Sequence, residues 1–131
     1  MFSDLAHARS SLKERLAPHV PDSWEINEFV RQLPTEFRNP VIVFEFHRFE
    51  RSANGVPLAP GFVAATFDII IASSQTVERE GEDDIDSLAL ALVRVLDKES
   101  DIYWDSADKQ KADTGSWLWR IHTTVLTETK E

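Results

Sequence analysis

The chain has 131 residues, of which 42% are hydrophobic and 28% charged, and its formal net charge is −9. These values suit one compact domain over residues 1–131 and exclude an intrinsically disordered chain. The acidic balance disfavours direct nucleic-acid recognition, and the absence of cysteine excludes disulfides, thiolate zinc sites and cysteine nucleophiles. Apolar runs are far shorter than the ~20 residues of a membrane span, so we expect a soluble protein made in the cytoplasm.

The first predicted element is an amphipathic helix over residues 3–16. Its apolar side chains recur at spacings of three and four, Ser3 can cap its N-terminus, and two prolines soon after it end the helix. The following residues, 22–40, predict an irregular connection. Within it, Trp24 and Ile26 alternate with a polar residue, as in a short edge strand.

Two long strands are predicted next, over residues 41–50 (VIVFEFHRFE) and 62–73 (FVAATFDIIIAS). In both segments apolar side chains occupy every second position, which places them on one face of a sheet. The connection, 52–61, contains Asn54-Gly55 and two prolines, a composition typical of turns. We therefore expect an antiparallel pair with an extended tip.

A second helix is predicted after the acidic stretch, because apolar residues of 85–96 recur with helical period. Residues 101–107 predict a short strand, 108–115 a polar turn, and 116–126 a long alternating strand. The expected fold class is α+β, with a mostly antiparallel sheet of about four strands and two helices packed on one face.

The acidic stretch EREGEDDID, residues 78–86, contains six carboxylates. Its acids do not follow the register of a calcium loop, and it lacks nearby histidine or cysteine for zinc. Asp83 or Asp84 can instead cap the second helix, and the other acids suit its positive end. We predict a solvated helix start with no metal, and a cation site remains the alternative.

The outward face of the sheet can gather Glu45, His47, Asp68, Arg120 and His122. Carboxylate and imidazole together could perform acid–base chemistry. An open sheet face, however, commonly carries cross-strand ion pairs, and a flat face lacks the concavity of a catalytic pocket. The sequence also lacks GxSxG, HExxH and GxxxxGK[ST] motifs. We therefore predict no catalytic, cofactor-binding or metal-binding residues.

Surplus apolar side chains predict contacts with other subunits. The helix after Asp84 is apolar beyond one stripe, which is typical of a helix covered on two sides. The stiff VPLAP segment carries apolar residues on a protrusion, although it could also fold back onto its own domain. The candidate subunit or tube interface residues are Leu90, Val93, Val56, Pro57, Leu58 and Pro60.

This layout resembles the tail terminator (tail-tube completion) proteins of long-tailed bacteriophages over nearly the whole chain. After the N-terminal helix, the resemblance lies in QLPTEFRNPVIVFEF, a long hairpin with a proline-rich tip, DDIDSLALALVRVLD and GSWLWRIHTTV. It implies a non-enzymatic virion protein that forms a ring, commonly a hexamer, at the head-proximal end of the tail. Such a ring stops growth of the tail tube and offers a docking surface to the head connector.

The resemblance also implies the partners: further copies of the chain, the major tail tube protein and a head-completion or connector protein. DNA would pass through the channel without specific binding, which agrees with the acidic charge. Three alternatives stay open. They are a head-closure or other neck or minor capsid protein, a small ferredoxin-like ligand-binding domain, and an enzyme that uses His47, His122 and Asp68.

Overall fold

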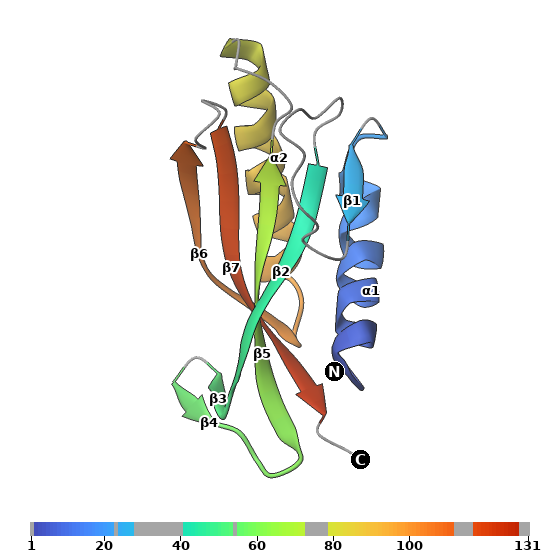
Figure 1. The fold of residues 1–131 in the computed structure, drawn as a ribbon, viewed down its shortest axis with the longest axis vertical. Helices are drawn as coiled ribbons and strands as arrows, with labels where there is room; N and C mark the ends of the chain where they lie inside the picture. The colour runs from blue at the N-terminus through green and yellow to red at the C-terminus, as the bar shows by residue number, and fades with distance from the viewer. Residues whose placement is uncertain are drawn as a thin grey trace.

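The structure, a computed structural model, describes residues 2–22, 24–27, 41–53, 55–72, 79–111 and 117–128, without the side chains of 79–84. The described residues form mostly β-sheet, together with two α-helices (Figure 1). In chain order the elements are α1 (Leu5–Leu16), the 3-10 helix η1 (Ala17–His19), β1 (Glu25–Asn27), β2 (Val41–Glu50), β3 (Ser52–Ala53), β4 (Val56–Pro57), β5 (Phe62–Ala72), α2 (Arg79–Asp97), β6 (Ile102–Lys111) and β7 (Trp117–Glu128).

The main sheet has five strands in the order β1-β2-β5-β7-β6, and β3 and β4 form a separate two-stranded hairpin. β1 runs parallel to β2, with Glu25 opposite Val41, whereas the other neighbours are antiparallel. The predicted fold class was therefore wrong, because the sheet is mixed and has five strands. A parallel edge strand needs a crossover connection, and the three residues of β1 give no pattern that reveals its direction.

The core lies between the two helices and one face of the sheet (Figure 1). Strand alternation directs apolar side chains of β2, β5 and β7 toward that face, where the apolar stripes of both helices cover them. Each fully buried aliphatic side chain contributes about 1.5–3 kcal/mol to folding. The largest fully buried side chains are Phe2, Phe44, Phe67, Leu12, Leu16, Ile42, Ile69, Ile70, Ile71, Ile85, Leu92 and Leu96.

The opposite face of the sheet, called the outer face below, has two parts. Val41, Val43, Ile70 and Ala72 form a second buried apolar cluster at one end of β2 and β5. These residues explain why the sequence there reads as continuous apolar runs, since both faces of this part are buried. Farther along the same strands, the outer face becomes polar at Glu45 and Asp68, and the candidate site lies there.

Several predicted boundaries were wrong. Asp4, not Ser3, caps α1, because its Oδ1 accepts a hydrogen bond from the His7 N–H at 2.7 Å. α2 begins at Arg79, so Asp83 and Asp84 lie inside the helix rather than at its cap. β6 continues to Lys111 through residues predicted as a turn, because polar side chains are tolerated in a strand at the edge of a sheet.

Within the described residues, neither helix combines the length and the apolar character that crossing a lipid bilayer requires.

Candidate functional site

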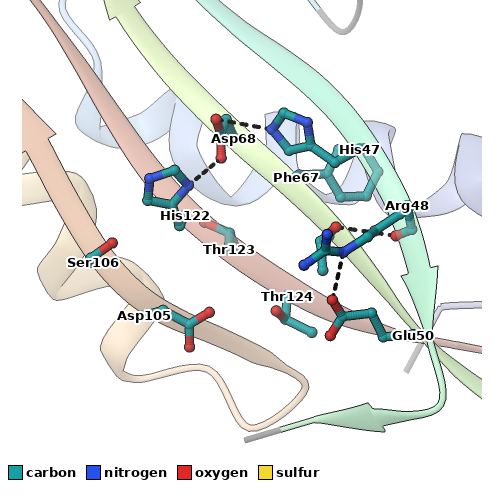
Figure 2. Close-up of a pocket in the computed structure, with 11 residues that line it drawn as sticks. His47, Arg48, Glu50, Phe67, Asp68, Asp105, Ser106, His122, Thr123 and Thr124 are labelled. Atoms are coloured by element: carbon teal, nitrogen blue, oxygen red, sulfur yellow. Dashed lines mark hydrogen bonds and ion pairs between the residues drawn. The ribbon is translucent and has the colours of Figure 1, made fainter. Parts of the chain in front are cut away.

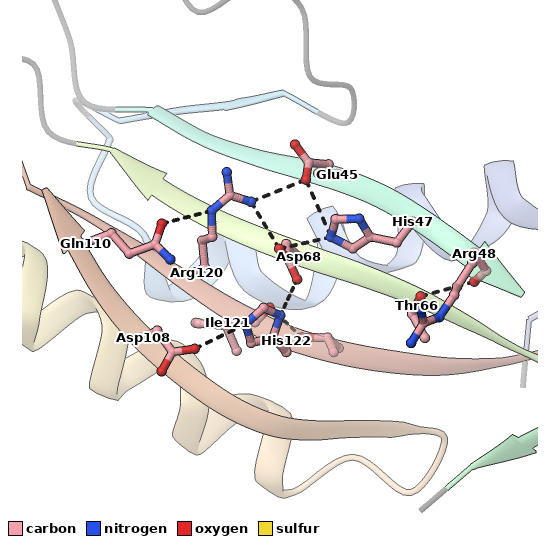
Figure 3. Close-up of polar contacts among 11 residues, drawn as sticks. Glu45, His47, Arg48, Thr66, Asp68, Asp108, Gln110, Arg120, Ile121 and His122 are labelled. Atoms are coloured by element: carbon pink, nitrogen blue, oxygen red, sulfur yellow. Dashed lines mark hydrogen bonds and ion pairs between the residues drawn. The ribbon is translucent and has the colours of Figure 1, made fainter. Parts of the chain in front are cut away.

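A row of polar residues crosses the outer face of the sheet (Figure 3). Glu45 on β2 lies opposite Asp68 on β5, and Asp68 lies opposite His122 on β7. His47 and Arg120 extend into the same row from β2 and β7. The structure therefore brings together all five outward-facing residues expected from the alternation of the strands. We call Glu45, His47, Asp68, Arg120 and His122 the Asp68 cluster.

Asp68 is the centre of this cluster, and its side chain is only 4% exposed. Its Oδ2 lies 2.9 Å from His47 Nε2 and 3.0 Å from Arg120 Nη1, and its Oδ1 lies 2.6 Å from His122 Nδ1. The Glu45 Oε1 atom shares two of these partners, at 3.3 Å from Arg120 and 3.4 Å from His47. The buried carboxylate is thus surrounded by hydrogen-bond donors, which its burial requires.

These contacts set the ionisation of Asp68. Burial of the carboxyl group raises its pKa, but hydrogen bonds from His47 and Arg120 and the nearby charge of His122 outweigh burial. The net result is a pKa below the ordinary value of 3.8. Asp68 is therefore ionised at neutral pH, and a carboxylate in this state accepts hydrogen bonds but donates none.

Two β-bulges shape the surface beside the cluster. The register of β2 shifts between Phe46 and Arg48, and that of β6 shifts between Trp104 and Ser106. The extra residues are His47 and Asp105. Each bulge places two consecutive side chains toward the outer face, and a bulge also bends its strand and increases the local twist.

The bulges line an open groove of about 720 Å³ on the outer face (Figure 2). The expectation of a flat face was therefore wrong, because the two bulges bend and twist the strands that border this part of the sheet. The lining residues are His47, Arg48, Glu50, Thr66, Phe67, Asp68, Asp105, Ser106, His122, Thr123 and Thr124.

The geometry of His122 bears on acid–base chemistry. A His–Asp pair can activate a hydroxyl nucleophile when the second ring nitrogen faces that hydroxyl. In this cluster His122 Nε2 instead lies 3.2 Å from Asp108 Oδ2, so both ring nitrogens face carboxylates. The arrangement joins strands β5, β6 and β7 through charged hydrogen bonds rather than directing a base at a hydroxyl.

Three residues of the Asp68 cluster carry groups that commonly bind metal ions. Glu45, His47 and Asp68 could offer ligand atoms that lie within 4.8 Å of one another. However, the Arg120 guanidinium lies 3.0 Å from Asp68 Oδ2 and 3.3 Å from Glu45 Oε1. A divalent cation between these carboxylates would have to displace a guanidinium that already pairs with both of them, so the trio fits an ion-pair network better than a metal site.

The acidic stretch falls largely outside the described side chains, except for Asp86. Its Oδ1 accepts a hydrogen bond from Trp119 Nε1 at 2.8 Å, and its Oδ2 lies 3.0 Å from Lys109 Nζ. These contacts fix the N-terminal half of α2 to strands β7 and β6. For this one acid, the structure shows a packing role on the surface of the sheet.

The predicted interface residues occupy two separate places. Leu90 on α2 is 51% exposed, and Val93 on the same helix is half-buried against the core. Val56 is 63% exposed at the start of β4, in a hairpin that projects beside the lower ends of β2 and β5 (Figure 1). The hairpin also carries exposed Pro57 and Pro60 and half-buried Leu58, whose N–H donates to the Arg51 carbonyl at 2.9 Å.

Comparison with protein-family models gives no match, and comparison with curated proteins gives none either.

Proposed function

We propose that this protein is a non-enzymatic assembly subunit of a long-tailed bacteriophage, which closes into a ring on the end of the tail tube. The ring, a hexamer by resemblance, stops growth of the tube and presents a docking surface to the head connector. It belongs to the head-proximal end of the tail. The single observation that carries the proposal is the exposure of large aliphatic side chains at two separate places, Leu90 on α2 and Val56 on the β3–β4 hairpin.

Two separate apolar surfaces favour a ring over a simple dimer. In a head-to-tail contact a subunit uses different surfaces toward its two neighbours, and repeated rotation can close such contacts into a ring. A two-fold dimer needs only one patch that pairs with itself. Helix α2 covers the upper part of the sheet, whereas the β3–β4 hairpin projects beside its lower part, which suits contacts with different neighbours (Figure 1).

The chemistry of the outer face supports a structural role. The buried Asp68 carboxylate lies within 3.0 Å of nitrogen atoms of His47, His122 and Arg120, and His122 bridges two carboxylates. Such a network holds strands in register and gives the sheet a defined shape. The net charge of −9 supports passage of DNA through a channel without retention, since like charges repel.

Electron microscopy of the purified protein, alone and mixed with the major tail tube protein, tests this proposal. We expect rings alone or on the ends of tubes, and a shorter mean tube length as the amount of protein increases. A protein that stays monomeric at high concentration and leaves tube length unchanged would refute it. Binding to a head connector without any effect on tubes would favour a head-closure or other neck protein instead.

A further inference from the structure

A second groove, of about 420 Å³, lies on the helix side of the sheet beside the N-terminal end of α1. Its apolar surface comes mainly from Leu5, Phe49 and Val63. Phe49 is 51% exposed although it faces the same side of the sheet as the core. The remaining lining residues are Asp4, Thr127 and Glu128.

This groove is a continuation of the hydrophobic core. The Phe67 ring is buried, the Phe46 ring lies 5.4 Å from it and is partly buried, and the Phe49 ring lies 5.0 Å beyond Phe46. The aromatic side chains therefore lead from the centre of the core to an exposed surface. An apolar extension of a core that ends in solvent is typical of a contact surface.

Thr127 gives a second sign that the groove is incomplete in a single copy. Its side chain is buried, and its Oγ1 atom has no hydrogen-bond partner in the part of the chain that the structure describes. Buried hydroxyl groups in native proteins are normally paired, because an unpaired one is unfavourable by about 1–3 kcal/mol. A chain segment that enters the groove can supply a carbonyl oxygen to this hydroxyl after a side-chain rotation.

The β3–β4 hairpin has the complementary properties. Val56 and Pro57 are exposed at its tip. Gly55, with a φ of 75°, lies between β3 and β4, and Gly61, with a φ of 93°, lies directly before β5. Across residues 51–61 the only charged residue is Arg51. The charged residues described along the groove, Asp4 and Glu128, are both acidic. The two surfaces thus match in apolar character and in charge.

We propose that the Val56–Pro57 tip of one copy inserts into the Phe49–Val63 groove of the next copy. The hairpin and the N-terminus lie on opposite sides of the lower part of the sheet, which suits a head-to-tail contact (Figure 1). Arg51 of the inserted hairpin then lies near the acidic edge of the groove. The inference rests on the proposed ring, and it identifies the surfaces through which neighbouring subunits join.

Disulfide cross-linking tests the contact directly, because the chain contains no cysteine of its own. A Val56→Cys variant is mixed with a Val63→Cys variant under mild oxidation. We expect a dimer band from the mixture and from neither variant alone, since a disulfide requires Cα atoms about 5.5–6 Å apart. The matched control pairs Val56→Cys with Leu90→Cys, another exposed aliphatic position, and should not cross-link.

Charge supplies a second readout. Val56→Asp and Val56→Lys both remove the apolar tip, and both should fold normally because the side chain is exposed. The Asp variant adds a negative charge beside Asp4 and Glu128, whereas the Lys variant adds a favourable one. We expect Val56→Asp to raise the concentration for half-assembly about tenfold more than Val56→Lys, and added salt to narrow this difference.

The outcomes separate this inference from the proposed function. Rings and tube capping without a Val56–Val63 cross-link, or a self-cross-link of Val56→Cys, would overturn the hairpin contact and leave the proposed function standing. Equal weakening by Val56→Asp and Val56→Lys would overturn it as well. A Val56–Val63 cross-link without any effect on tubes would support the contact and overturn the proposed function.

Discussion

The Asp68→Asn substitution probes the centre of the outer-face cluster. It keeps the size of the side chain but removes the charge that His47, Arg120 and His122 contact at 2.9, 3.0 and 2.6 Å. Hydrogen bonds to charged groups contribute about 1.5–3 kcal/mol each, and loss of one partner of a buried ion pair is unfavourable by about 3–5 kcal/mol. Because the three partners are partly exposed, we take a lower value and expect a loss of about 2–4 kcal/mol of unfolding free energy at pH 7.

The loss of unfolding free energy in Asp68→Asn should become smaller as the pH falls. The pKa of Asp68 is lower in the folded protein than its ordinary value of 3.8. Its ionised form therefore contributes stability above the unfolded pKa, and this contribution disappears as the pH falls through the folded pKa. The difference between wild type and Asp68→Asn should thus be full at pH 5 and should shrink below about pH 4.

Urea unfolding followed by circular dichroism at pH 7, 5 and 3 measures both effects. Asp105→Asn is the matched control, because Asp105 lines the same groove but is exposed. We expect the control to change the unfolding free energy by less than about 0.5 kcal/mol. Equal losses for the two variants, or a difference between wild type and Asp68→Asn that persists at pH 3, would refute the reasoning.

Further predictions concern the core and the helices. Asp101→Asn should lose about 1.5–3 kcal/mol at pH 7, because the hydrogen bond from Arg15 at 2.7 Å holds the pKa of Asp101 well below its usual range. The loss should shrink below about pH 4 in urea titrations, and a constant loss would contradict it. Leu92→Ala should lose about 2–5 kcal/mol in thermal unfolding, because its side chain is fully buried, and a loss under 1 kcal/mol would show a collapsed cavity. Leu90→Asp should leave the unfolding of the monomer within about 0.5 kcal/mol of wild type but reduce ring formation seen by electron microscopy, and unchanged rings would remove Leu90 from the interface.

The sequence predicted correctly which face of the sheet a side chain occupies where the alternation of apolar and polar residues is regular. The alternation in 41–47 and in 62–72 placed Phe44 and Phe67 in the core and Asp68 on the outer face, and the structure agrees. The antiparallel pairing of these two strands was also predicted correctly. Strand alternation has a period of two. Once two strands are known to pair, the sequence therefore predicts which of their side chains lie together on one face of the sheet.

The groove of the Asp68 cluster was missed because it depends on breaks in that period. Inward-facing residues of β2 are Phe44, Phe46 and then Phe49, with a step of three across the bulge at His47. In β6 the step of three runs from Trp104 to Ala107. These steps were visible in the sequence and could have indicated both bulges. The parallel direction of β1, in contrast, depends on tertiary packing of only three residues.

The position of β7 has a consequence for synthesis of the protein. The strand nearest the C-terminus, Trp117–Glu128, lies between β5 and β6 in the interior of the sheet. A chain emerging from the ribosome cannot pair β5 on that side until these residues have been made, and the edge of β5 stays open to other nascent chains meanwhile. The main sheet therefore cannot close until β7 has been made, and premature termination before residue 117 would leave β6 without its partner strand in that sheet.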